Sequence, residues 1–146
     1  MRIYLDLCCL KRPFDDQKQP RAHVESEAVL SIMAAEGDQV EFVRSRAHHL
    51  ENEQNPDGQR AERVREWLSP SASPEIDDVL LSSRTAELTA LGFKNFDAFH
   101  LASAEMAGTD VFSSCDDRLL AAARRHSTSL KVRVVDPVSL LRELNP

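Results

Sequence analysis

Short apolar segments alternate with longer amphipathic segments along the whole chain, and this alternation restricts the fold more than any other feature. The short segments are typical of buried strands, and the long ones have the spacing of apolar residues expected of helices. We expect strands at residues 2–5, 39–43, 111–112 and 132–135. Strands that alternate with helices predict a parallel sheet covered on both faces. The expected fold is therefore α/β: a three-layer α/β/α sandwich with a small, mostly parallel sheet of four to five strands.

The expected helices are bounded by capping and turn residues. They cover residues 21–36, 45–52, 59–68, 76–91, 97–108, 116–126 and a last segment that starts at Pro137. Glycine often follows a helix, and Gly37, Gly92 and Gly108 stand at such positions. The sequence NPDG at residues 55–58 predicts a turn, and SPSASP at residues 69–74 predicts a surface loop. The apolar residues expected along the helix at residues 76–91 are Ile76, Val79, Leu80, Leu88 and Leu91.

The size and composition of the chain fit one folded domain. Its 146 residues predict a single domain, residues 1–146, with a normal hydrophobic core. A content of 42% hydrophobic and 29% charged residues is typical of a folded chain and not of a disordered one. No apolar stretch is long enough to span a membrane, and the start of the chain lacks a signal-peptide pattern. We therefore expect a cytoplasmic protein with no membrane partner.

The net charge of −6 disfavours one class of function. Proteins that bind nucleic acid without specificity are usually basic, so the acidic balance argues against that class. It does not argue against an enzyme whose acidic centre holds a divalent cation, because such a centre itself lowers the net charge.

The cysteines are Cys8, Cys9 and Cys115. An odd number, with two residues adjacent, does not suggest a disulfide framework. A zinc site is usually built from spaced ligand pairs such as C-x-x-C, and this sequence has none. We expect buried, reduced thiols rather than metal ligands or redox groups.

Carboxylates stand where the expected strands end and the helices begin. Asp6 follows the first strand, and Asp116 follows the third strand and begins a helix. Asp97 begins the helix before that strand, and Glu51 lies on the helix after the second strand. The carboxyl ends of parallel strands share one edge, so Asp6 and Asp116 can meet there and the other two can reach it. Each also has a simpler interpretation, as a turn residue, a helix N-cap or part of a solvated helix face.

Carboxylates that converge repel one another unless they are protonated or bridged by a cation. Mg²⁺ and Mn²⁺ prefer carboxylate and water oxygens, so either is the expected cofactor of such a group. A centre of this kind can activate water and stabilise the charge of a phosphoryl transition state.

Four sequence blocks resemble the successive blocks of a PIN domain. They are LDLCCLKRPFDDQ, RAHHLENEQNPD, NFDAFHLASAEMAG and FSSCDDRLL, and the resemblance extends from Arg2 to about Pro137. PIN domains are small α/β/α nucleases, and many are the toxins of VapC type in bacterial toxin–antitoxin pairs. The resemblance implies a metal-dependent ribonuclease with RNA as substrate, a cognate antitoxin protein as partner, and a homodimer as a plausible assembly.

The resemblance also implies roles for individual residues. Asp6, Glu51, Asp97 and Asp116 match the catalytic acidic residues of the family. Asp6, Asp97 and Asp116 would be metal ligands, and Glu51 would be a ligand or would orient water. Ser114 matches a residue that hydrogen-bonds near the metal.

Residues around this group are expected to support it. Asp117 is a candidate for an outer position of the acidic group. Arg12 and Arg118 are candidates for a cationic rim that binds substrate phosphates. The expected role of His100, three residues after Asp97, is packing or capping. His48 and His49 are adjacent and cannot place both rings on one helical face.

Two other functions remain open from the sequence. A PIN-like scaffold could have lost cleavage and act as a binding module through a protein partner. A phosphoryl-transfer protein of receiver or phosphatase type also has an Asp after its first strand. A haloacid-dehalogenase-like phosphatase would carry a second Asp two residues later, where this chain has Cys8.

Overall fold

The computed structural model of the chain describes residues 1–69 and 75–146. The strands are β1 (Arg2–Leu5), β2 (Glu41–Phe42), β3 (Val111–Ser113) and β4 (Arg133–Val135). They form one parallel sheet in the order β2-β1-β3-β4. This confirms the predicted α/β class and the small parallel sheet. Beyond Ser69, the loop expected at residues 69–74 lies outside the described residues.

Every expected helix is present. The helices are α1 (Leu7–Lys11), η1 (a 3₁₀ helix, Arg12–Phe14), α2 (Pro20–Ala34), α3 (Arg46–Glu53), α4 (Gly58–Leu68), α5 (Asp78–Ala90), α6 (Asn95–Met106), α7 (Asp117–Arg125) and α8 (Pro137–Leu144). Sequence analysis did not predict α1, because a five-residue helix is too short to show a periodic pattern. It begins where the side chain of Asp6 accepts a hydrogen bond from the Leu7 backbone amide.

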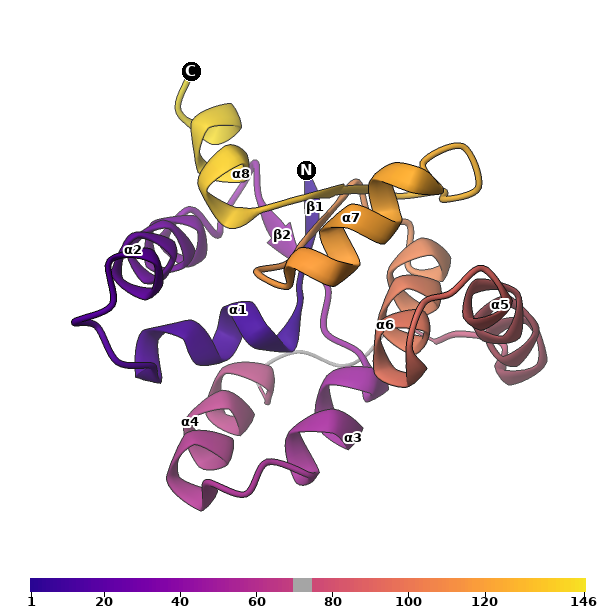
Figure 1. Cartoon of the computed structure of the whole chain (residues 1–146), viewed down its shortest axis with the longest axis horizontal. Helices are drawn as coiled ribbons and strands as arrows, with labels where there is room; N and C mark the ends of the chain where they lie inside the picture. Colours follow the sequence, from indigo (N-terminus) through magenta and orange to yellow (C-terminus); the bar gives the residue numbers. More distant parts are fainter. Residues whose placement is uncertain (70–74) are drawn as a thin grey trace.

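Side chains from alternate residues of the strands enter two separate cores. On β1, Ile3 and Leu5 belong to one buried cluster, and Tyr4 belongs to the other. The first cluster is completed by residues of α1, α2, α4 and α8, and the second by residues of α5, α6 and α7. Figure 1 shows α2 and α8 on one side of the strands and α5 and α6 on the other. The three-layer α/β/α arrangement predicted from the sequence is confirmed.

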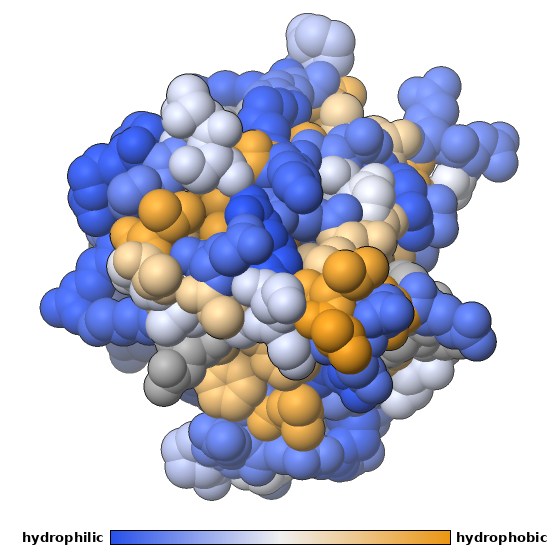
Figure 2. Space-filling model, turned by 90° about the vertical axis from the view of Figure 1, so that its right-hand side faces the viewer, coloured by the Kyte–Doolittle hydropathy of each residue, from blue (hydrophilic) through white to orange (hydrophobic). Residues whose placement is uncertain are grey.

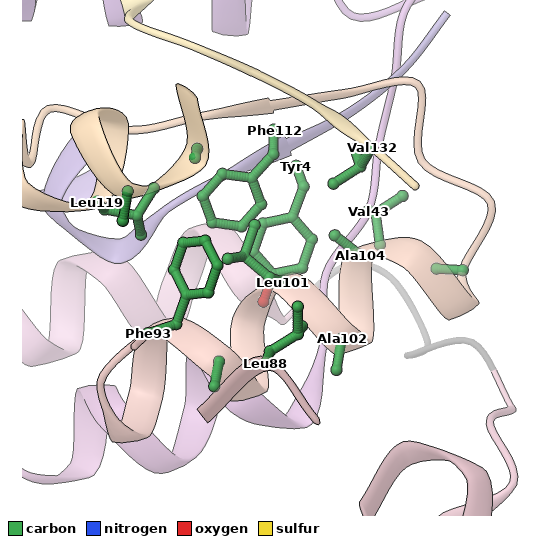
Figure 3. Close-up of a cluster of buried hydrophobic side chains, with 14 of the residues drawn as sticks. Tyr4, Val43, Leu88, Phe93, Leu101, Ala102, Ala104, Phe112, Leu119 and Val132 are labelled. Atoms are coloured by element: carbon green, nitrogen blue, oxygen red, sulfur yellow. The ribbon is translucent and has the colours of Figure 1, made fainter. Parts of the chain in front are cut away.

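An aromatic stack lies at the centre of the second cluster. The rings of Tyr4 and Phe112, from neighbouring strands, stack at 5.1 Å between centroids with 12° between their planes. Leu88, Phe93 and Leu101 surround this pair (Figure 3). The Tyr4 hydroxyl, drawn red in Figure 3, gives this hydrocarbon cluster a polar end. Its hydrogen bonds connect the core to the candidate site described below.

The buried face of α5 differs from the one suggested by the apolar residues of the sequence. Leu81 and Leu88 are buried, whereas Val79 and Leu80 are 74% and 60% exposed. Leu81 and Leu88 are two turns apart and share the helix face that packs towards α6. Figure 2, which views the molecule from the α5 side, shows apolar patches within a mostly hydrophilic surface. Among the described residues, no helix has the length and apolar character needed to cross a membrane.

The two faces of α5 give a direct test of the packing. We expect Leu88→Ala to lower the free energy of unfolding by about 2–5 kcal/mol, because it leaves a cavity in the core. Leu80→Ala, the same change on the exposed face, should change it by less than about 0.5 kcal/mol. Urea unfolding of both variants measures the difference. Similar losses in the two variants would contradict the orientation of α5.

Candidate metal centre

The candidate site lies at the carboxyl edge of the sheet, where β1 and β3 end side by side. Leu5 and Ser113 are partners in the register of these strands. The next residue, Asp6, donates its backbone N–H to the Ser113 carbonyl oxygen at 2.9 Å. The Ser114 hydroxyl donates a hydrogen bond of 2.8 Å to Asp6 Oδ2. The strand pairing therefore brings these two predicted site residues into contact.

Asp6 is almost completely buried, with 5% of its surface exposed. Its Oδ1 accepts a hydrogen bond of 2.8 Å from the Leu7 amide, and its Oδ2 also accepts one of 3.3 Å from the Cys8 thiol. Burial raises the pKa of Asp6 well above its usual value, and the nearby Cys8 and Asp97 raise it further. His100 and the Ser114 hydrogen bond act in the opposite direction but do not cancel the effect. The charged form of Asp6 is therefore unfavourable unless a positive charge lies nearby.

Glu51 and His100 meet beside Asp6. His100 Nε2 lies 2.8 Å from Glu51 Oε1, and its Nδ1 lies 2.5 Å from the Tyr4 hydroxyl. Burial alone lowers the pKa of His100, but the Glu51 hydrogen bond and the charges of Asp6, Glu51 and Asp97 outweigh it, so the pKa is raised. One ligand atom from each of Asp6, Glu51 and His100 lies within 4.8 Å of the others. These three side chains could hold a metal ion.

Asp97 takes a different local position from the one expected. It lies in the first turn of α6, and the N-cap of that helix is Lys94. The interpretation of Asp97 as an N-cap is therefore wrong, because α6 begins two residues earlier than the pattern suggested. Burial, followed by the charge of Asp116, raises the pKa of Asp97 to about 6. Glu51 adds to this increase and His100 opposes it.

Asp116 is the N-cap of α7, as its sequence position predicted. Its Oδ1 accepts hydrogen bonds from the backbone amides of Arg118 at 2.9 Å and Leu119 at 3.4 Å. It is also close enough to Asp97 to raise the pKa of that carboxyl group. Asp116 therefore caps α7 and also belongs to the acidic group. Through Asp97, the four predicted acidic residues form one electrostatically connected group.

The residues expected around the acidic group have different surroundings. Asp117 forms two hydrogen bonds of 2.8 Å with Arg21, which lower its pKa. Arg12 is bonded to Glu25 at 3.0 Å. Both are thus engaged in ion pairs with other side chains. Arg118 is exposed and forms no ion pair within residues 1–69 and 75–146, so its charge is available to a ligand.

His48 has a structural role, whereas the contact made by His100 was missed by sequence reasoning. The His48 ring stacks on Tyr4 at 4.3 Å, accepts a hydrogen bond from the Ser45 amide and donates one to the Leu5 carbonyl. Burial lowers its pKa well below the usual value, which keeps the ring neutral. His100 is fully buried, as a packing residue would be, yet it also binds Glu51. The three-residue spacing of Asp97 and His100, which places both on one side of the helix, was the sequence signal that His100 lies near the acidic group.

Asp6, Glu51 and His100 offer two carboxylates and one imidazole, which are groups that can ligate a metal ion. Comparison of the chain with protein-family models, curated proteins and solved structures finds no significant match.

The raised pKa of Asp97 predicts a pH-dependent change in stability. The folded state binds this proton more tightly than the unfolded state, so its contribution is fully present below about pH 4 and is lost as the pH rises through about 6. The full shift corresponds to about 3 kcal/mol, and screening at this partly exposed group reduces it to about 1–2 kcal/mol. We expect Asp97→Asn to gain that amount relative to the natural protein between about pH 4 and about pH 7 without added metal.

Unfolding by denaturant across this pH range measures the gain. Asp38→Asn, at an exposed carboxylate, is the matched control and should show no such trend. A difference between Asp97→Asn and the natural protein that stays constant with pH would show that Asp97 is not electrostatically strained.

Proposed function

We propose that the chain is a metal-dependent ribonuclease that hydrolyses phosphodiester bonds in RNA. The observation that carries this proposal is that Asp6 and Glu51 meet at one edge of the sheet, within reach of one ion together with His100. Asp97 and Asp116 add negative charge to this group, and the pKa values of Asp6 and Asp97 are raised. Such a group is stabilised by a divalent cation. The resemblance to PIN domains supports RNA as the substrate.

The carboxylates suit Mg²⁺ or Mn²⁺, because these ions prefer oxygen ligands. Asp6, Asp97 and Asp116 would hold the ion, with Glu51 as a further ligand or as the group that orients water. The bound ion would supply Lewis-acid activation of the phosphate and of water. His100 is already bonded to Glu51, so we assign it a positioning role.

The surrounding side chains fix the acidic groups in place. Ser114 holds Asp6 Oδ2, and His100 holds Glu51. The Tyr4 hydroxyl is bonded to both His100 and Ser45, the latter at 2.7 Å, so the aromatic core fixes the imidazole ring. Buried, hydrogen-bonded partners of this kind keep ligand atoms in one geometry.

Proton release and substrate binding involve three residues of the site. Asp97 has a pKa of about 6 without the ion, so it would lose its proton as the ion binds. The side chain of Glu51 is 31% exposed, so it is open to water and substrate. Arg118 follows Asp116 by two residues and offers an exposed cation to a substrate phosphate.

The biological setting follows from the resemblance. It supports the proposal that the chain is the toxin of a type II toxin–antitoxin module, with a cognate antitoxin protein as its partner. It also supports a homodimer. We place the protein in the cytoplasm, where its proposed RNA substrate occurs.

Cleavage of a mixed RNA pool tests the proposal. The purified protein is incubated with Mg²⁺, with Mn²⁺ and with EDTA, beside the variants Asp6→Asn, Asp97→Asn and the exposed control Asp38→Asn. We expect cation-dependent cleavage that falls about 100-fold or more in the first two variants and persists in the control. The resemblance predicts products with 5′-phosphate and 3′-hydroxyl ends.

Two results would contradict the proposal. Cleavage that persists in EDTA, or in both site variants, would exclude the acidic group as the catalytic centre. Absence of cleavage by a folded protein that still binds Mn²⁺ would favour the non-catalytic module that acts through a protein partner.

A further inference from the structure

All the cysteines of the chain gather at the edge of the sheet, next to the acidic group. Cys8 and Cys9 are consecutive in α1, and Cys115 lies between β3 and α7. The three Sγ atoms lie within 4.8 Å of one another, and those of Cys9 and Cys115 are 3.6 Å apart. The sequence predicted buried, reduced thiols rather than metal ligands, because it has no spaced ligand pair such as C-x-x-C.

Hydrogen bonds to the backbone at the end of β3 and just after it hold this thiol cluster (Cys8, Cys9 and Cys115) in place. The Cys9 thiol donates a hydrogen bond of 3.4 Å to the Ser113 carbonyl oxygen. The Cys115 amide donates one of 3.3 Å to the Cys8 sulfur. The three sulfur atoms are thus positioned by the same strand pairing that positions Asp6, and little rearrangement is needed to bring them onto one ion.

The distances suit shared coordination of one ion. Thiolates bind Zn²⁺ at about 2.3 Å, so two of them around one tetrahedral or trigonal ion are about 3.8–4.0 Å apart. The Cys9–Cys115 separation of 3.6 Å is close to this value. A disulfide would instead require the same atoms to approach to about 2.05 Å. The observed spacing is nearer to that of a metal site.

The residues around the thiol cluster can balance the negative charge of its thiolates, and the cluster is accessible to a metal ion. The guanidinium of Arg12 interacts electrostatically with Cys115. Arg12 Nε is buried and has no hydrogen-bond partner in the described part of the chain. Arg21 Nη2 donates a hydrogen bond of 3.1 Å to the Cys115 carbonyl oxygen. Cys8 is only partly buried, which gives an ion a path to the cluster.

We propose that Cys8, Cys9 and Cys115 form a second metal site, which binds a thiophilic ion such as Zn²⁺ or Cu⁺. Thiolate ligands select these ions, whereas the neighbouring carboxylates select hard cations. As three sulfur–metal bonds form, the three thiol protons are released to solvent. The site goes beyond the proposed ribonuclease activity and does not depend on it.

Titration of the reduced, full-length protein with Cd²⁺, a thiophilic probe, tests this site. A sulfur-to-cadmium charge-transfer band in the near ultraviolet should saturate at one ion per chain and should resist excess Mg²⁺. Cys9→Ala and Cys115→Ala should each weaken binding by more than about 100-fold, because loss of a direct ligand exceeds the 10–100-fold cost of losing an outer-shell partner. Asp38→Asn, which removes an exposed carboxylate outside both groups, should keep the band.

A second measurement on the unmodified sequence covers the case in which a cysteine variant does not fold. Zn²⁺ should slow the alkylation of the partly buried Cys8 relative to the metal-free protein, as followed by mass spectrometry; Cys9 and Cys115 are buried with or without the ion. The absence of a charge-transfer band, a band unchanged in Cys115→Ala, or alkylation of Cys8 that Zn²⁺ does not slow would overturn the proposal.

Discussion

The pairing of β1 with β3 is the constraint on which both candidate sites depend. It sets Leu5 beside Ser113, and the residues that follow these strands supply Asp6 and Asp116 to the acidic group and all three cysteines to the thiol cluster. The same register stacks Tyr4 on Phe112. A slip of one residue would turn Tyr4 to the other face of the sheet and would separate Asp6 from Ser114. Fold and site are therefore specified by the same hydrogen bonds.

The acidic group is a source of electrostatic strain within an otherwise well-packed domain. Burial raises the pKa values of Asp6 and Asp97, so their charged forms are unfavourable near neutral pH without a counter-charge. His100 supplies part of that counter-charge, and its position is fixed by Tyr4 in the hydrophobic core. A divalent cation would supply the rest. Perturbed carboxyl groups of this kind are a common feature of functional sites.

The sequence predicted the features that depend on local patterns. Alternating strands and helices indicated the α/β class, and the position of Asp6 at a strand end indicated its place at the sheet edge. The cap of α6, the buried face of α5 and the contact between His100 and Glu51 depend on how helices pack, which periodicity does not specify. The thiol cluster depends on a pairing between distant segments, so no local spacing could reveal it.

We propose above all that the carboxyl edge of the sheet holds a hard divalent cation. Crystals of the protein soaked in Mn²⁺ test it most directly, because anomalous scattering locates the ion without assumptions about activity. The account predicts an anomalous peak coordinated by Asp6 and at least one of Glu51, Asp97 and Asp116. A map with no peak at this edge, while Mn²⁺ is present at saturating concentration, would contradict it.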